Sequence, residues 1–412
     1  MTNLFLLAAS DAAPPLDLSL QIPLSVLHFL EFAIWGAWWV VLGNYLNSIG
    51  FTRKQIGSIY ATMPIGSILA PMFIGTVADR FFAGEQLMGV LHLAGAGLLF
   101  WLAKIKSPRP FFWVALVYAL VYSPTLALVN SIPFAHIPDA QRDFPVIRVL
   151  GTIGWIFAGL SLKFFLRPGQ PVNNRPILLA AALSLALGVF SFFLPHTPPQ
   201  ADASGEIPFL RAMALFKEPS FAVFFGVSFL ITIALAFYYS FTALFLERRV
   251  GVRAQNVGPV MTIGQWMEII FLLALPWFLE YFGMKWVLAM GMAAWAIRYA
   301  LFAIGSPLVL VILGIALHGI CFDFFFAAGF IHVEQTAAKD IANSAQSLFA
   351  VLTYGLGMYL GTEAAGRLNH ALVTQQEDAE SSTAEGESGW TMFWLIPCLG
   401  ASVCLLLFLL LS

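Results

Sequence analysis

Residues 221–246 read FAVFFGVSFLITIALAFYYSFTALFL, without a single Asp, Glu, Lys or Arg. A helix rises about 1.5 Å per residue, so this stretch is long enough to cross the roughly 30 Å hydrocarbon core of a bilayer. Similar stretches recur along all 412 residues, of which 60% are hydrophobic and 10% charged. Soluble domains contain roughly 25% charged residues. The chain is therefore predicted to be an all-α polytopic membrane protein.

Apolar stretches of this kind predict twelve membrane spans, separated mostly by short breaks. Their predicted ranges are 22–46, 57–77, 86–103, 110–132, 145–165, 176–194, 221–246, 257–279, 284–304, 307–332, 344–367 and 390–411. A longer polar break, from Pro195 to Pro219, divides them six and six. We therefore expect an N-terminal segment (1–21), an N-terminal six-helix bundle (22–194), a central cytoplasmic linker (195–220) and a C-terminal six-helix bundle (221–412). Two bundles that rock around a site at mid-membrane are typical of secondary transporters.

Several classes of function are excluded or disfavoured by what the sequence lacks. The net charge is -2 and no Lys/Arg run occurs, which argues against a nucleic-acid surface. No G-x-x-x-x-G-K-[ST] motif occurs, so the chain alone does not drive transport with ATP. The three cysteines have no paired spacing, and the histidines form no H-E-x-x-H motif. We therefore expect that the chain binds no metal and no cofactor and is not an enzyme.

Ionisable residues inside the predicted spans are few, and each is a candidate for function. A charged group at this depth costs at least ~2.5 kcal/mol, so it is rarely present without a role. Three acids and two bases qualify, drawn from both halves: Glu31, Glu268, Asp323, Arg148 and Arg298. A carboxyl group in such a site can switch between neutral and charged as a cavity opens. We expect Glu268 and Asp323 to couple protons, Glu31 to be the alternative proton carrier, and Arg298 to be a structural partner.

Spacing places further side chains beside these charges. Gln265 and Glu268 are three residues apart, and Arg148 and Thr152 are four apart, so each pair shares a helix face. Aromatic residues from three predicted helices are expected to add stacking surface for a ring-bearing solute: Trp35, Trp38, Tyr238, Tyr239, His318 and Phe322. For any single one of them, packing or a position at the membrane interface is the alternative role.

Four motifs carry a family resemblance. Gly75-Thr-Val-Ala-Asp79-Arg80 follows the second span and resembles the G-x-x-x-D-R core of the major facilitator superfamily. Three further stretches lie in spans 1, 5 and 10: FLEFAIWGAW (29–38), DFPVIRVLGTIGW (143–155) and HGICFDFF (318–325). Together they resemble the nucleoside:proton symporter family of that superfamily, across essentially the whole chain.

The resemblance implies the major facilitator fold, with both termini cytoplasmic and a central nucleoside site. It gives Asp79 and Arg80 a structural role. It also implies that six residues match polar and aromatic site positions of the family: Arg148, Thr152, Gln265, Glu268, Phe322 and Asp323.

Other positions depart from the characterised nucleoside transporters of the family. Ala236 and Tyr239 stand where those proteins offer Gln and Asn, and His318 stands where they carry Tyr. Glu31 replaces a neutral amide. In these features the chain is more similar to another branch of the family, whose members are named nucleoside transporters only because they resemble the characterised ones.

The predicted function is proton-coupled symport, by alternating access, of a nucleoside or a related polar ring-bearing solute. Symport or facilitated transport of another small polar solute, such as a sugar, is an alternative, and so is a solute sensor without flux. We expect a monomer in the bacterial inner membrane, with protons, solute and lipid as partners and no nucleic acid. Counting Lys and Arg in the loops alone predicts the inverted orientation, and the motif-based topology is preferred.

Overall fold

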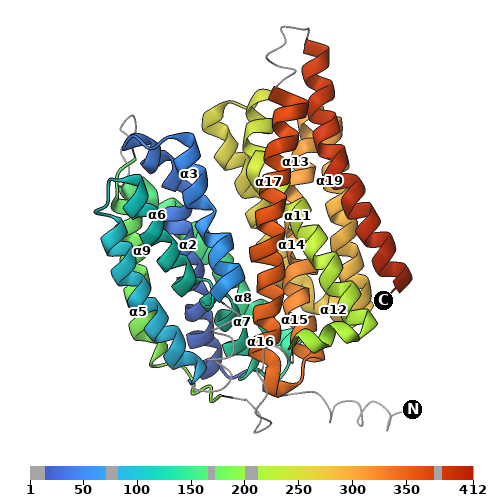
Figure 1. The fold of residues 1–412 in the computed structure, drawn as a ribbon. Helices are drawn as coiled ribbons and strands as arrows, with labels where there is room; N and C mark the ends of the chain where they lie inside the picture. The colour runs from blue at the N-terminus through green and yellow to red at the C-terminus, as the bar shows by residue number, and fades with distance from the viewer. Residues whose placement is uncertain (1–13, 71–81, 166–171, 200–211, 375–382, 412) are drawn as a thin grey trace, which may run out of the picture.

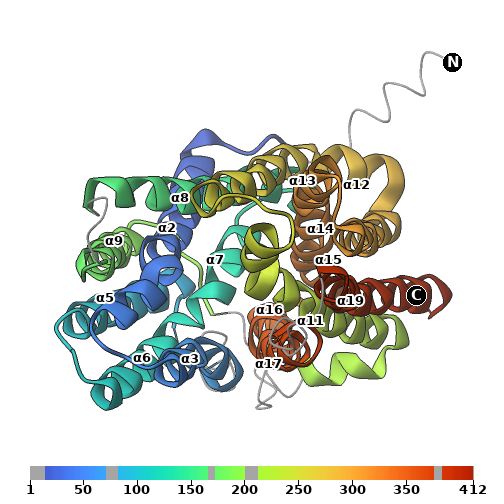
Figure 2. The same cartoon turned by 90° about the horizontal axis from the view of Figure 1, so that it is seen from above.

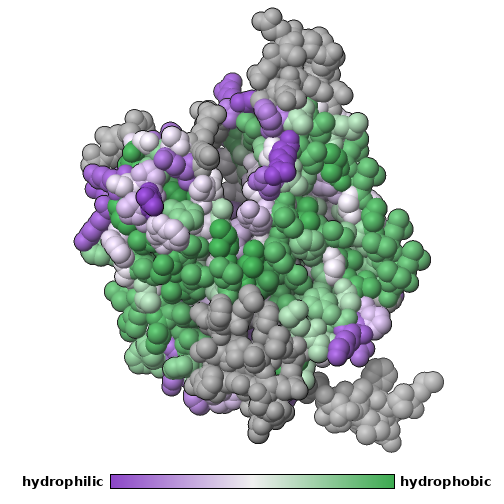
Figure 3. Space-filling model, in the orientation of Figure 1, coloured by the Kyte–Doolittle hydropathy of each residue, from purple (hydrophilic) through white to green (hydrophobic). Residues whose placement is uncertain are grey.

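The computed structural model describes all residues except 1–13, 71–81, 166–171, 200–211, 375–382 and 412. The described chain is nearly all helical, which confirms the all-α prediction. Eight of its helices are long and apolar enough to cross a membrane, and Arg175–Ser191 is a shorter apolar helix. Figure 3 shows an apolar band around the middle of the molecule, with hydrophilic side chains gathered towards its two ends.

The helices of the N-terminal half correspond to the first six predicted spans. They are α2 (Leu18–Ser48), α3 (Arg53–Tyr60), α5 (Gly84–Leu102), α6 (Pro108–Tyr122), α7 (Thr125–Phe134), α8 (Ala140–Phe165) and α9 (Arg175–Ser191). The fourth predicted span is divided at Ser123 and Pro124, because proline offers no N–H to the helix. The end of the second span lies outside the described residues.

The helices of the C-terminal half correspond to the last six predicted spans. Its α-helices are α11 (Pro219–Arg248), α12 (Ala254–Ile304), α13 (Leu308–Ala316), α14 (His318–Phe322), α15 (Ala328–Thr336), α16 (Ala342–Ala350), α17 (Met358–Asn369) and α19 (Thr383–Leu411). Three π-helical segments interrupt them, η2 (Asp323–Ala327), η4 (Val351–Gly357) and η5 (His370–Thr374), and two short 3₁₀ turns are η1 (Leu215–Lys217) and η3 (Lys339–Ile341). Two predicted spans are joined within α12, where Gly283 has φ 77° and ψ 163°, a conformation that favours glycine.

Polar residues begin several helices at the ends of the bundle. The Asp17 carboxylate accepts a hydrogen bond from Ser19 N–H at 3.0 Å, which lowers the pKa of Asp17. Thr52 and Gln55 form a reciprocal capping box at the start of α3. Asp139 accepts hydrogen bonds from the backbone N–H groups of Gln141 and Arg142 at the start of α8. These caps satisfy N–H groups that a helix cannot pair internally.

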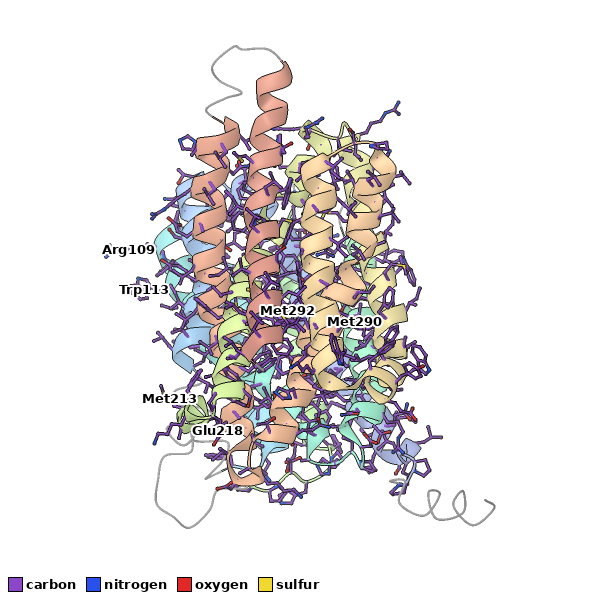
Figure 4. All side chains as sticks on the ribbon, turned by 90° about the vertical axis from the view of Figure 1, so that its right-hand side faces the viewer. Arg109, Trp113, Met213, Glu218, Met290 and Met292 are labelled. Atoms are coloured by element: carbon purple, nitrogen blue, oxygen red, sulfur yellow. The ribbon has the colours of Figure 1, made fainter. Side chains whose placement is uncertain are left out.

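Two hydrophobic clusters form the interior, one for each half. The first joins residues from Leu24 to Leu194, and the second runs mainly from Phe221 to Phe408. Figure 2 shows α2, α5, α6 and α9 grouped on one side, with α11, α12 and α19 on the other. Figure 4 illustrates the difference between the surface and the interior: Trp113 points away from the helices, whereas Met292 lies among them.

The two halves meet at one end of the molecule and separate towards the other (Figure 1). At the closed end α7 lies against α16, and α8 lies against α15. Phe134 and Phe144 stack with ring centres 4.3 Å apart and join the C-terminal cluster. Gln141 Nε2 donates to Gln335 Oε1 at 3.4 Å between the halves. Figure 3 shows the surface hollowed between the halves at the opposite end.

Glycine permits close approach between helices within each half. A Cβ atom on Gly154 of α8 would collide with the Phe29 carbonyl oxygen of α2. On Gly361 of α17, it would lie 2.6 Å from Ala236 Cβ of α11. Small residues at such crossings let membrane helices gain van der Waals contact that larger residues prevent.

We predict that Gly154→Ala destabilises the protein while Gly159→Ala on the same helix does not. The first adds a methyl group against backbone atoms, a kind of overpacking that costs about 1–3 kcal/mol. The second places its methyl group where no atom lies within 4 Å. Thermal unfolding of the purified variants in detergent measures both. Equal unfolding temperatures for the two variants would contradict this description of the α2–α8 crossing.

Candidate functional site

A hydrogen bond joins the two halves deep inside the molecule. Thr152 Oγ1 of α8 donates to Glu268 Oε1 of α12 at 2.7 Å. Thr152 is 5% exposed and Glu268 is 8% exposed. A buried carboxyl group with a neutral hydroxyl as its partner can exist in either protonation state.

Arg148 lies one turn before Thr152 on α8 and is also buried. Its guanidinium carbon stands 4.3 Å from the centre of the Phe32 ring, a cation–π contact with α2. Its charge acts on both Glu268 and Asp323. In the described part of the chain, Arg148 Nη1 has no hydrogen-bond partner. A buried donor without a partner is costly, so this atom is available to a ligand.

Asp323 supplies the second carboxyl group from the C-terminal half. It is 1% exposed and is the first residue of the π-helical segment η2. Both of its carboxyl oxygens lack hydrogen-bond partners among the described residues. π-Helical turns occur frequently at functional sites, because the wider turn presents side chains that a regular helix would not.

Aromatic side chains surround the carboxyl groups. Tyr238 of α11 stacks on His318 of α14, with ring centres 5.1 Å apart. His318 Nε2 lies 3.9 Å from Glu268 Oε2. Phe322 is 5.7 Å from the His318 ring, and Tyr239 meets the same ring edge-on at 6.3 Å. Tyr239 is nevertheless 51% exposed, so these rings border open space between the halves.

Trp35 is a second contact between the halves. Its ring lies edge-on to Trp155 of α8 at 5.8 Å and to Tyr354 of the opposite half at 6.4 Å. The prediction did not include Trp155, Tyr354 or Phe32 in the site. Trp155 follows Thr152 by three residues, and this spacing indicated a shared helix face. Tyr354 directly precedes the first residue of the Gly355, Gly357 and Gly361 series.

Other predicted residues make their polar contacts away from the Thr152–Glu268 bond. Trp38 packs on Tyr118 in the N-terminal core and is 2% exposed, so it offers no surface to a ligand here. Arg298 Nε donates to the Gly314 carbonyl at 3.0 Å, and its guanidinium carbon lies 4.3 Å from the Tyr238 ring. Glu31 is buried among the N-terminal helices.

The remaining predicted positions complete the set. Gln265 is half-buried on α12, one turn before Glu268. Asp79 and Arg80 lie outside the described residues. Among the described residues, no group of three or more His, Cys, Asp or Glu side chains is arranged to hold a metal ion. The site therefore offers one guanidinium, two carboxyl groups, a hydroxyl and several aromatic faces, a combination suited to a polar ring.

Comparison with known proteins assigns the chain to a family. The model of the nucleoside H⁺ symporter family matches residues 18–412. The chain is 39% identical over 380 residues to the Escherichia coli (strain K12) protein named "Putative nucleoside transporter YegT", covering 89% of each. It is 33% identical over 399 residues to the nucleoside permease NupG of the same organism, covering 92% of each.

Solved structures agree with this assignment. A crystal structure of a mutant of the nucleoside transporter NupG covers 95% of this chain and 99% of its own, with 31% identity and a TM-score of 0.70. The major facilitator superfamily transporter FucP, in its outward conformation, has a TM-score of 0.71 over 95% of this chain and 99% of its own at 17% identity. The predicted major facilitator fold is thereby confirmed. The chain belongs to the nucleoside H⁺ symporter family, whose members are membrane transporters and not enzymes.

Proposed function

We propose that this chain couples proton entry to the uptake of a nucleoside, or of a closely similar polar ring-bearing solute, by alternating access. One observation carries the proposal: the Thr152–Glu268 hydrogen bond joins the two halves beside unpaired polar atoms of Arg148 and Asp323. A site shared by two bundles is rearranged whenever the bundles rock, so binding there is coupled to opening and closing.

The solute is proposed to bind between these polar groups and the aromatic rings. Arg148, with its free Nη1, offers a donor, while Asp323 and Glu268 accept hydrogen bonds from ribose hydroxyls or base N–H groups. Gln265 supplies both a donor and an acceptor, and Tyr239 or Phe322 supplies a face for stacking. A site of this kind rejects analogues that lack the hydroxyl groups, because its own buried polar atoms then stay unpaired.

Glu268 and Asp323 are proposed as the proton-coupling residues. Both are buried, both are within the field of Arg148, and the charge of Glu268 acts on Asp323. Two acids beside one cation favour a single net negative charge on the two carboxyl groups, so one of them carries a proton. When the solute brings hydrogen-bond donors to the site, the balance between these states changes, and proton binding is coupled to solute binding.

One observation favours a sugar as the alternative solute. Tyr239 and His318 form an aromatic wall near Glu268, and a tyrosine face suits a sugar ring as well as a nucleobase. Under this alternative, the carboxyl groups would bind ring hydroxyls in the same way.

The chain is further proposed to be a monomer in the bacterial inner membrane, without nucleic-acid partners. Residues 22–194 and 221–412 would form the two moving bundles, residues 195–220 the linker between them and 1–21 a separate N-terminal segment. Both termini are proposed to be cytoplasmic. The closed end carries the α7–α8 and α15–α16 connections, so in this orientation the structure opens to the outside (Figure 1).

A prediction of this function concerns uptake and its driving force. In proteoliposomes with an inward proton gradient, uridine or adenosine should accumulate, and hexoses should compete weakly. Glu268→Gln and Asp323→Asn each replace a carboxyl group by an amide that cannot carry the coupling proton, so each should abolish accumulation. Exchange of labelled for unlabelled solute should survive in the variant that removes only the coupling proton.

Glu363→Gln is the matched control, because Glu363 is exposed and pairs with Arg367 on α17. It should accumulate solute like the wild type. Competition by hexoses with no response to any nucleoside would replace the nucleoside by a sugar. Full accumulation by both carboxyl variants would show that neither residue couples the proton.

A further prediction concerns orientation. Single cysteines can be placed at two exposed positions at opposite ends of the bundle: Ser48, the last residue of α2, and Ala338, which directly precedes η3. In intact cells, with the native cysteines replaced, an impermeant maleimide should label the Ser48→Cys variant and not the Ala338→Cys variant. The opposite labelling pattern would invert the proposed topology.

A further inference from the structure

A buried acid–imidazole pair lies inside the N-terminal helices, apart from the site between the halves. Glu31 Oε2 of α2 lies 2.8 Å from His92 Nε2 of α5. The Glu31 side chain is 0% exposed and that of His92 is 1% exposed. Thr125 Oγ1 of α7 donates to the other carboxyl oxygen, Glu31 Oε1, at 2.7 Å.

The protonation of the imidazole follows from its hydrogen bonds. Ser184 Oγ of α9 donates its single proton to the His92 carbonyl oxygen at 2.9 Å. The same Oγ lies 3.1 Å from His92 Nδ1, so it must accept there, and Nδ1 carries a proton. In the neutral form of this tautomer, Nε2 has a bare lone pair facing a carboxyl oxygen. Two lone pairs at 2.8 Å repel each other, and neither Nε2 nor Oε2 has a hydrogen-bond partner among the described residues, so a proton on the pair relieves this repulsion.

The surroundings favour one proton on the pair. Around it, α6 contributes the hydroxyl groups of Tyr118 and Tyr122, while α7 and α9 contribute Thr125 and Ser184. The cation of the adjacent α8, Arg148, lies over Phe32 and acts on Glu268 and Asp323. With the shared proton the pair is neutral overall. Without it, an uncompensated negative charge stays buried among apolar helices, which is costly.

We propose that Glu31 and His92 form a second proton-binding site, which holds one proton between Oε2 and Nε2 and is separate from the carboxyl groups between the halves. The proton leaves only when water reaches the pair, and the two bare lone pairs then push Glu31 and His92 apart.

The pair is connected to the contact between the halves. Tyr122 donates its hydroxyl proton to the Glu31 carbonyl oxygen at 3.1 Å, and its ring packs edge-on against Trp35. Trp35 lies one turn after Glu31 on α2 and touches Tyr354 of the opposite half. Movement of Glu31 is therefore transmitted to this contact. The role in transport rests on the proton coupling proposed above, whereas proton binding by the pair does not.

Infrared difference spectra between acidic and alkaline pH test the site directly, on the full chain in lipid without solute. The wild-type spectrum should contain a carboxyl or imidazolium component that is lost in both Glu31→Gln and His92→Gln, because one shared proton needs both residues. Ser184→Ala keeps both residues but removes the acceptor for Nδ1–H. It should change the position of that component in the spectrum.

The chain contains a matched control pair. Glu85 Oε1 and His196 Nδ1 are also 2.8 Å apart, but the His196 side chain is 68% exposed. His196→Gln should leave the component unchanged. Persistence of the component in either Glu31→Gln or His92→Gln, or an unchanged component in Ser184→Ala, would overturn the proposal even if the other variants fail to fold.

Proton-coupled uptake of uridine tests the role in transport. Glu31→Gln and His92→Gln should lower the number of protons moved per uridine by the same amount, and the double variant should lower it no further. Exchange of labelled uridine should survive. An additive effect would show that the two residues do not act as one site. If the protein transports no nucleoside, the function proposed above is wrong. The infrared spectra would still show whether Glu31 and His92 bind a proton.

Discussion

The Thr152–Glu268 hydrogen bond is the contact on which the arrangement of the site depends. It is buried, it joins α8 to α12, and the unpaired groups of Arg148 and Asp323 lie within the same electrostatic environment. Each half has its own hydrophobic cluster, so the halves can move relative to each other without unfolding. A hydrogen bond between such bodies is readily exchanged for one to a solute, because its net contribution is only about 1 kcal/mol.

The fold was largely predictable because the bilayer leaves few choices. In hydrocarbon, every backbone polar group must be satisfied within a helix or a closed barrel, so long apolar runs such as 221–246 become helices. Gly283 and Pro124 mark breaks for local steric reasons. The π-helical segment at Asp323 was not predicted, because its extra residue per turn leaves no signature in the hydrophobic pattern.

The candidate site was predictable only in part. Arg148, Thr152, Glu268 and Asp323 stood out because polar groups are rare in apolar spans. Tyr354 and Phe32 did not, because aromatic residues are abundant here and only packing decides which of them face a charge. The partner of Glu31 was missed for a similar reason: His92 was one of several scattered histidines, and only the packing of the N-terminal helices places its side chain at 2.8 Å.

The two acidic groups differ in their electrostatic environment. Glu268 and Asp323 share the field of a cation, Arg148, and we propose that their protonation responds to solute. Glu31 shares its proton with an imidazole in a closed apolar interior. The central claim is that the two halves rock around the Thr152–Glu268 contact, and distances between spin labels measure this most directly. Labels at Ser107 and Ser306, at the open end, should approach each other when uridine and protons are added, while labels at Ala135 and Ala338, at the closed end, should separate. Unchanged distances at both ends, or changes of the same sign, would contradict the account.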